Sequence, residues 1–319
     1  MYLPYIQIPQ ISDPSQIKLK VEWQTVAVIV AIYSCWLGLT YFHASIPGAL
    51  LFTMGGALVA WHSSLQHEII HGHPTSNKKL NWLFALPPLA LWLPFEIYRR
   101  SHLEHHRDEV LTDPSKDPES KYWDPLDWDD LTAVGQFVAL VQAPLLGRLL
   151  IGPFWSIGLF LTQETNLFIN GDKTRRKIWL NHALLVVPVI LWLTLVCKMN
   201  LLEYLYSFVY PGTAILLLRS FAEHRAVKEV KHRTAIVERA HVFGLLFLNN
   251  NLHAVHHRHP TLPWYDLPAK YEENREEILN ENGGLVYDGY GDVLKRFLFT
   301  PHDVLLHPSL RPVDKRVTQ

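Results

Sequence analysis

Residues 66–74 read QHEIIHGHP, and this stretch fits two incompatible metal chemistries. The pattern H-E-x-x-H on a helix places His67 and His71 one turn apart. Both imidazoles can then bind one zinc ion, while Glu68 serves as the general base of a metalloprotease. The same two histidines can instead belong to a larger site that holds two metal ions and activates oxygen. The remaining histidines of the chain decide between these interpretations.

Two further histidine clusters share this helical spacing. Both follow the pattern H-x-x-H-H, and their members are His102, His105 and His106 in RRSHLEHHRDEV and His253, His256 and His257 in NNNLHAVHHRHP. Offsets of three and four residues put side chains on one face of a helix, about one turn apart. The imidazoles of each cluster can therefore converge on one metal ion or on a pair of them.

The eight histidines of the three clusters exceed what one metal ion takes from a protein. Structural zinc is four-coordinate, and catalytic zinc keeps three protein ligands. We therefore predict a site that holds two metals. Neutral imidazoles leave the charge of the metals uncompensated, so carboxylates are expected around the ligands. The candidates are Glu68, Glu104, Asp108, Asp113 and Asp266.

The composition favours histidine as the metal-binding residue type. The 319 residues include 18 histidines but only two cysteines, Cys35 and Cys197, and both lie inside apolar runs. This excludes a cysteine-rich metal site or a disulfide framework. Imidazole combined with carboxylate suits iron, zinc or manganese. The formal net charge of −1 gives no indication of nucleic-acid binding.

Four stretches are apolar enough for the roughly 20 residues that a membrane-spanning helix needs. They cover residues 23–42, 48–61 with a continuation through His67 and His71, 178–196 and 201–218. The short turns HASIP and CKMN join them into two hairpins, so the three histidine clusters can reach one face. We therefore predict an all-α integral membrane protein with four transmembrane helices in two hairpins and a cap that carries a histidine-rich di-metal site.

Basic residues assign this face to the cytoplasm. The two turns contain one basic residue, Lys198, whereas the opposite face receives KTRRK at residues 173–177 and several further lysines and arginines. Under the positive-inside rule the histidine-bearing face is cytoplasmic.

Two more apolar stretches, residues 80–97 and 133–161, contain prolines and are predicted to form interfacial helices. If residues 80–97 crossed the membrane, His71 and His102 would lie on opposite sides. We expect one domain over residues 1–319. It comprises an irregular segment at 1–20 without a signal peptide, a core at about 23–270 and a cytoplasmic segment at 271–319.

The three histidine clusters on a four-span scaffold resemble the membrane fatty acid desaturase and hydroxylase superfamily. The flanking segments HHRDEVLTDPSKDPES and HHRHPTLPWYDLP add to this resemblance, which extends from about Trp23 to Pro268. It implies a non-haem site of two iron ions that activates O2 and removes hydrogen from an unactivated C–H bond. We call the three clusters the first, second and third histidine box, in chain order. The first box has three residues between its histidines, as in bacterial desaturases and in alkane and carotenoid hydroxylases. This implies a bacterial inner membrane.

The resemblance also implies a ninth ligand. In acyl-CoA desaturases a histidine just beyond the last span completes the set, and an asparagine four residues earlier acts through water. The segment LLLRSFAEHR places His224 at the first position, but Ser220 stands where the asparagine would be. His73 and His259 flank boxes and precede prolines, so we expect both to turn away. The predicted iron ligands are His67, His71, His102, His105, His106, His224, His253, His256 and His257.

The implied function is the O2-dependent formation of a double bond in a fatty acyl or related lipid chain, and PTLPWYDLP favours a desaturase. Hydroxylation of an alkane, fatty acid or carotenoid, alkene-forming decarboxylation of a fatty acid and desaturation of an amino-acid-derived metabolite remain open on the same scaffold. Each turnover needs two external electrons. The chain contains no electron-transfer motif, so a separate ferredoxin or cytochrome b5-type donor is expected at the basic face.

Two alternatives come from other classes. An intramembrane zinc protease needs a third, carboxylate ligand near a later span, but residues 178–196 and 201–218 contain no aspartate, and Glu203 lies at the wrong end. It also leaves the second and third clusters unexplained. A metal transporter would place its ligands at mid-membrane, whereas these clusters lie beyond the ends of the spans. The sequence disfavours both.

Overall fold

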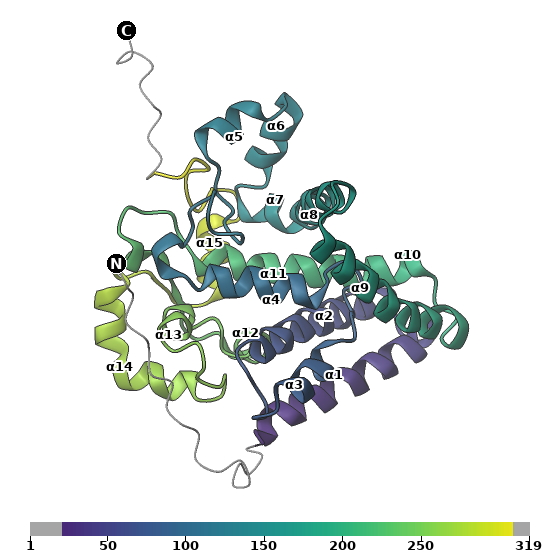
Figure 1. The fold of residues 1–319 in the computed structure, drawn as a ribbon. Helices are drawn as coiled ribbons and strands as arrows, with labels where there is room; N and C mark the ends of the chain where they lie inside the picture. The colour runs from purple at the N-terminus through teal and green to yellow at the C-terminus, as the bar shows by residue number, and fades with distance from the viewer. Residues whose placement is uncertain (1–20, 309–319) are drawn as a thin grey trace, which may run out of the picture.

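The computed structural model describes residues 21–308, and Figure 1 shows that helices dominate it. Four helical segments are long and apolar enough to cross a membrane. They are α1 (Trp23–Tyr41), α2 (Gly48–Ile70), α9 (Lys173–Leu191) with a π-helical continuation (Trp192–Val196), and a segment made of α10 (Leu201–Tyr204), a π-helical turn (Leu205–Val209) and α11 (Tyr210–Glu223). The predicted all-α fold with four long apolar helices is confirmed. The predicted irregular segment at 1–20 lies outside the described residues.

The turns of the two hairpins lie at the same end of the molecule. A 3-10 turn (His43–Ser45) joins α1 to α2. The ring of His43 bonds the Glu203 carboxylate through Nδ1 at 2.9 Å and the carbonyl of Cys197 through Nε2 at 3.2 Å. Because this histidine ties the two turns together, the opposite ends of α2 and α11 also come together. In Figure 1 the turns lie on the right and these opposite ends on the left.

Glycines allow α2 and α11 to pack closely. A Cβ atom at Gly56 would lie 2.6 Å from Cβ of Pro211, and one at Gly212 would lie 2.7 Å from Cβ of Val59. Both distances are too short for any side chain larger than hydrogen. Small residues let the backbones of neighbouring membrane helices approach in this way. The contact fixes the end of α2, with its two box histidines, against the end of α11.

Each of the two proline-containing apolar stretches is divided among several elements and does not form one long helix. Residues 80–97 fall into α3 (Lys78–Ala85), an irregular segment and the start of α4 (Phe95–His105). Residues 133–161 fall into α6 (Ala133–Val141), α7 (Leu145–Leu150) and the start of α8 (Gly152–Ile169). Pro144 directly precedes α7, and Pro153 lies in the first turn of α8. Proline is tolerated at such positions because it has no N–H to donate.

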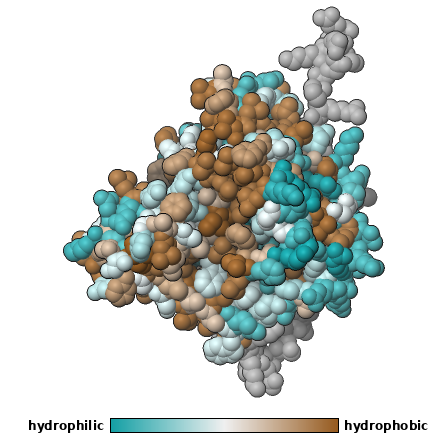
Figure 2. Space-filling view, turned by 180° about the vertical axis from the view of Figure 1, so that it is seen from behind, coloured by the Kyte–Doolittle hydropathy of each residue, from teal (hydrophilic) through white to brown (hydrophobic). Residues whose placement is uncertain are grey.

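Large apolar side chains cover much of the surface. Val30, Leu184 and Leu202 on the long helices and Phe154 on α8 are all exposed. Figure 2 shows hydrophobic residues gathered at the top of the view and down its centre. Apolar patches of this extent mark a surface that another phase or molecule covers, as expected for helices that face lipid.

Most of the remaining elements form a cap at the histidine-bearing end. They are 3-10 turns (Asp108–Val110 and Val230–Arg233), α12 (His241–Leu246), α13 (His253–Arg258), α14 (Leu267–Glu281), α15 (Tyr290–Phe297) and the strands β1 (Ile236–Val237) and β2 (Val286–Tyr287). The short helix α5 (Pro125–Asp130) instead lies beside α6 (Figure 1). The two strands pair in parallel, with Ile236 opposite Val286. This pairing ties the C-terminal segment to the core, and α14 runs across the boundary predicted near residue 270.

The close approach of α2 and α11 leads to a prediction for Gly56→Ala. The added methyl group would meet Pro211, and such overpacking costs about 1–3 kcal/mol of stability. We expect a lower thermal unfolding temperature and weaker metal retention, because the ends of α2 and α11 separate. Gly38→Ala in α1 is the matched control, since a Cβ at Gly38 meets no atom within 4 Å. Equal unfolding temperatures for the two variants would contradict the packing argument.

Candidate metal centre

Four helix ends meet in the cap, and each brings histidines. The box of α2 ends with His71 directly after its last residue, and the box of α4 ends with His106 in the same way. The third box forms α13, and His224 directly follows α11. The helical spacing in the sequence therefore corresponds to helical turns in the structure. The exception is His224, whose position depends on the packing of α11 against α2.

The nine predicted histidines fall into two groups of potential metal ligands. Within each group the ring nitrogens lie within 4.8 Å of one another. One group contains His67, His71, His102, His106 and His256, and the other contains His105, His224, His253 and His257. Each group draws on at least three of the four helix ends. The box of α4 contributes to both groups, since His102 and His106 belong to the first and His105 to the second. These histidine clusters are able to hold metal ions.

The Nε2 atoms of each group point toward a common centre. Their separations are 3.0 Å for His71–His102, 3.0 Å for His102–His106 and 3.1 Å for His106–His256. In the other group they are 3.0 Å for His105–His224, 2.9 Å for His224–His253 and 3.1 Å for His253–His257. Nε2 of His67 is buried and has no hydrogen-bond partner among the described residues. A shared cation is the simplest partner for lone pairs arranged in this way.

Burial and mutual repulsion keep most of these imidazoles neutral. Burial and, to a smaller extent, the neighbouring His102 lower the pKa of His71 to about 2. The pKa values of His224, His253 and His256 also lie well below the usual value for the same two reasons. A neutral imidazole offers a lone pair to a metal ion, and metal binding then needs no proton release from that ring.

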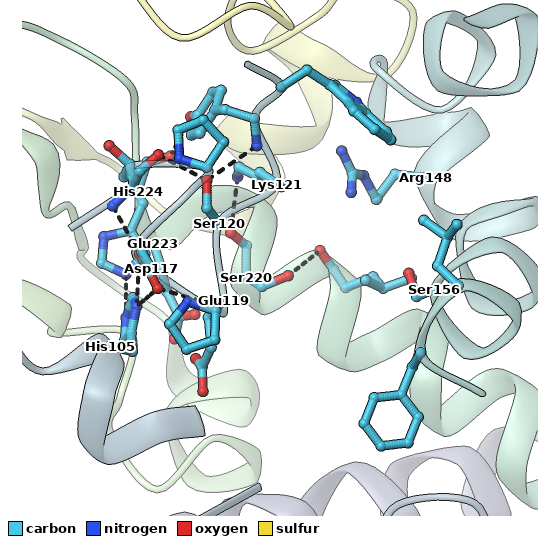
Figure 3. A pocket seen from close by; sticks show the side chains of 18 of the residues that line it. His105, Asp117, Glu119, Ser120, Lys121, Arg148, Ser156, Ser220, Glu223 and His224 are labelled. Carbon is cyan, nitrogen blue, oxygen red and sulfur yellow. Dashed lines mark hydrogen bonds and ion pairs between the residues drawn. The ribbon is translucent and has the colours of Figure 1, made fainter. Parts of the chain in front are cut away.

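Outer partners orient the rings through Nδ1. Nδ1 of His105 lies 2.9 Å from the Asp117 carboxylate, and Nδ1 of His102 lies 3.3 Å from Glu119. Figure 3 shows these acidic side chains beside the histidines at one end of a cavity. Such partners fix the tautomer of a ligating histidine and raise its basicity.

The second group has further outer partners from α11 and the adjoining loops. Nδ1 of His253 lies 3.2 Å from the amide oxygen of Asn250 and 3.4 Å from Glu223, and Nδ1 of His224 lies 3.2 Å from the carbonyl of Arg233. Each of these rings therefore turns Nε2 inward, toward its group.

His105 differs in charge from its neighbours. Burial lowers its pKa, but the carboxylates of Glu119 and Asp117 outweigh this effect and raise the pKa to about 9. Without a bound metal this ring is therefore protonated at neutral pH, and a metal ion that binds it must displace one proton.

Of the carboxylates proposed from the sequence, the structure describes the surroundings of Glu68, Glu104, Asp113 and Asp266. Glu68 is buried and accepts a hydrogen bond from the backbone N–H of Trp264 at 3.2 Å. Glu104 pairs with Arg107 on the exposed side of α4. Asp113 accepts a hydrogen bond from the N–H of Ser115. Asp266 directly precedes α14, and the side chain of Asp108 lies outside the described residues.

Among the described side chains, the carboxylates that contact box histidines include Asp117, Glu119 and Glu223. The first two lie in DPSKDPES, directly after the second box, and Glu223 directly precedes His224. Their adjacency to the boxes was the available signal, but it does not distinguish them from Asp113 or Glu104.

The remaining flanking residues lie outside the two groups. His73 contacts the Glu22 carboxylate through Nδ1 at 2.9 Å, and His259 directly follows α13. Neither belongs to a potential metal group. Ser220 donates to the carbonyl of Leu217 at 3.4 Å.

A cavity of about 440 Å³ adjoins the histidines. His102, His105, His224 and His253 border it on one side, and apolar residues of α8 and α11, including Leu159, Phe160 and Leu217, border it elsewhere. The volume lies within the range of small-molecule sites. A molecule bound in this cavity would lie beside both histidine groups.

The outer partners lead to a prediction for Asp117→Asn. Asparagine keeps the shape and one acceptor oxygen but removes the charge that supports His105. We expect the metal affinity of the group containing His105 to fall about 10–100-fold, as measured by chelator competition and metal analysis. Asp113→Asn in the same loop is the matched control and should retain wild-type affinity. An unchanged affinity in Asp117→Asn would show that this carboxylate has no role in metal binding.

Comparison with known proteins agrees with this geometry. Residues 42–289 match the family model described as fatty acid desaturase. A comparison with curated proteins gave no significant match. The matched residues make up most of the chain and include all nine clustered histidines. The chain therefore belongs to the fatty acid desaturase family.

Proposed function

We propose that this enzyme uses two iron ions and O2 to introduce a double bond into a fatty acyl or related lipid chain. The observation that supports this most directly is the presence of two neighbouring histidine groups at the wall of one cavity. One group contains five histidines and the other contains four. In this proposal the nine histidines of the two groups are the iron ligands.

The number of imidazoles in one group favours a metal other than structural zinc. Five imidazoles exceed the four ligands that structural zinc takes. When bound, the iron ions would supply the activation of O2 and the removal of hydrogen.

The protein itself holds the metals, positions the substrate and excludes water. His67, His105, His253 and His256 are almost fully buried, so bulk water has little access to the centre. The apolar side chains of the cavity wall can fix an alkyl chain beside the histidines. Orienting the reacting bond in this way is the contribution that a rigid scaffold makes to such a reaction.

We propose that the metal centre faces the cytoplasm and receives electrons from a separate acidic protein. The hairpin turns lie at the opposite end of the molecule, and the run KTRRK at residues 173–177 begins α9 on the side of the cap. A second cavity, of about 790 Å³, is bordered by Lys78, Lys79, Arg99 and His71. These basic residues would attract an acidic ferredoxin or cytochrome b5-type donor close to one of the histidine groups.

The histidine ligands do not separate desaturation from hydroxylation of an alkane, fatty acid or carotenoid, or from alkene-forming decarboxylation, since each begins with removal of hydrogen from carbon. We favour desaturation because the fatty acid desaturase family model covers all three boxes.

Metal and product analyses test the proposal. The purified protein should contain about two iron ions per chain, and cells that express it should form an alkene from a supplied saturated acid, as detected by mass spectrometry. His67→Ala should lose iron and activity, whereas His259→Ala, outside both groups, should retain them. An oxygenated product without an alkene would overturn desaturation, and one zinc ion with proteolytic activity would overturn the proposal as a whole.

Glu68→Gln separates the two interpretations of H-E-x-x-H. Glu68 accepts from the N–H of Trp264, and the amide oxygen of glutamine can accept the same bond. We therefore expect this variant to keep iron and at least a third of the wild-type activity. A metalloprotease base would instead lose several orders of magnitude on the same substitution. Complete loss of activity with iron still bound would contradict the proposed role of Glu68.

A further inference from the structure

Two basic side chains, Lys121 and Arg148, line the same cavity as the box histidines. Figure 3 shows the Arg148 side chain extending from the opposite side of the cavity toward Lys121. We propose that these two residues form an anion subsite that binds the free carboxylate of the substrate. The identification of this anion as part of the substrate rests on the proposed function, whereas the binding of the carboxylate does not.

Arg148 has no partner of its own among residues 21–308. Its Nε atom is buried without a hydrogen bond, and its guanidinium forms no ion pair with any described carboxylate. The side chain as a whole is partly exposed, and a charged group removed in part from water is normally paired because an unpaired one is costly. The guanidinium fork matches the two oxygens of a carboxylate.

Lys121 is held at the end of α11, close to the histidines. Its ammonium group donates to the carbonyls of Ser220 and Phe221, both at 3.0 Å. These two residues precede His224 by only four and three positions. Burial and the nearby charge of Arg148 lower the pKa of Lys121 to about 7. At neutral pH this lysine is therefore only partly charged, and a bound anion would stabilise its charged form together with the charge of Arg148.

The neighbouring carboxylates are already engaged. Asp303 accepts hydrogen bonds from the hydroxyl of Tyr122 at 2.5 Å and from the N–H of Ala226 at 3.1 Å. Glu223 lies 3.0 Å from Arg219. Glu119 contacts His102, as described above, and Asp127 is exposed. None of these carboxylates forms an ion pair with Arg148 among the described residues, so its charge stays uncompensated by a direct contact.

Gln142 provides an independent sign of a missing ligand. Its side chain is only 5% exposed and lines the cavity, yet its amide oxygen has no hydrogen-bond partner among the described residues. A half-turn of the amide exchanges the oxygen for the NH2 group, which can then donate to an anion. Gly147 allows α7 to lie directly against residues 141 and 142, because a Cβ at this position would clash with the carbonyl of Val141. This contact brings Gln142 and Arg148 into one wall.

The subsite favours a free acid over an ester or a thioester. An ester or thioester carbonyl carries no charge and would leave the charge of Arg148 uncompensated. Because Lys121 and the box histidines border one cavity, the subsite also places the carboxylate end of the substrate in the same space as the metal centre.

Binding to the purified full-length protein in nanodiscs tests the subsite without turnover. The probes are octanoate, methyl octanoate and octyl phosphate, and the measurement is the dissociation constant from calorimetry. We expect octanoate to bind at least tenfold more tightly than the ester. Arg148→Gln should weaken octanoate binding at least tenfold and remove this preference, whereas Arg148→Lys should retain part of it. Arg275→Gln, which removes an exposed arginine paired with Glu238, should behave as wild type.

Equal binding of octanoate and its ester to the wild-type protein, or an undiminished preference in a folded Arg148→Gln variant, would overturn the subsite. Tighter binding of octyl phosphate than of octanoate would overturn its assignment to carboxylate.

If Arg148→Gln does not fold, the variant Gln142→Leu tests the subsite instead, and we expect it to lose octanoate affinity severalfold. Iron content is measured in parallel. A protein that lacks iron but prefers the acid would refute the proposed function and not the subsite.

Discussion

The structure depends on the convergence of nine imidazoles at the ends of four helices. Lone pairs that point at one another across about 3 Å repel unless a cation lies between them, so the scaffold must hold them together before a metal can bind. It does so with short, rigid connections: His224 directly follows α11, and His71 directly follows α2. The glycine contact between α2 and α11 determines how far apart these two ends lie. The positions of the histidines at the metal centre therefore depend on how the long helices pack.

The periodic part of this arrangement was predictable from the sequence. Offsets of three and four residues identified the box histidines, and long apolar runs identified the spans, because both signals follow from the geometry of a single helix. His224 could be predicted only from the resemblance to a known family, because a single histidine after a helix belongs to no repeating spacing. Its membership of the second group depends on the position of α11 relative to α4 and α13, which are far apart in the sequence.

The supporting carboxylates were not predictable in the same way. Asp117 and Glu119 lie in an irregular loop, near the start of which Thr112 has a φ of 66°. The residues of such a loop follow no regular spacing, so the sequence does not predict which of its side chains face the histidines. Glu104 lies inside the second box, but a helix turns about 100° per residue. The face that presents His102, His105 and His106 inward therefore turns Glu104 outward, toward Arg107. The helical period alone was sufficient to exclude it.

The cavity combines two demands that normally oppose each other. A reactive metal centre needs an environment with little water, and partial burial there makes the uncompensated charge of Arg148 costly. An apolar residue of similar volume at this position would cost the fold less. Unlike Arg219, which has Glu223 beside it, Arg148 has no carboxylate partner among the described residues. The charge of Arg148 forms a favourable ion pair only when an anion binds in the cavity. Its cost is then part of substrate selection, because a neutral ligand leaves it unrelieved while an acid does not.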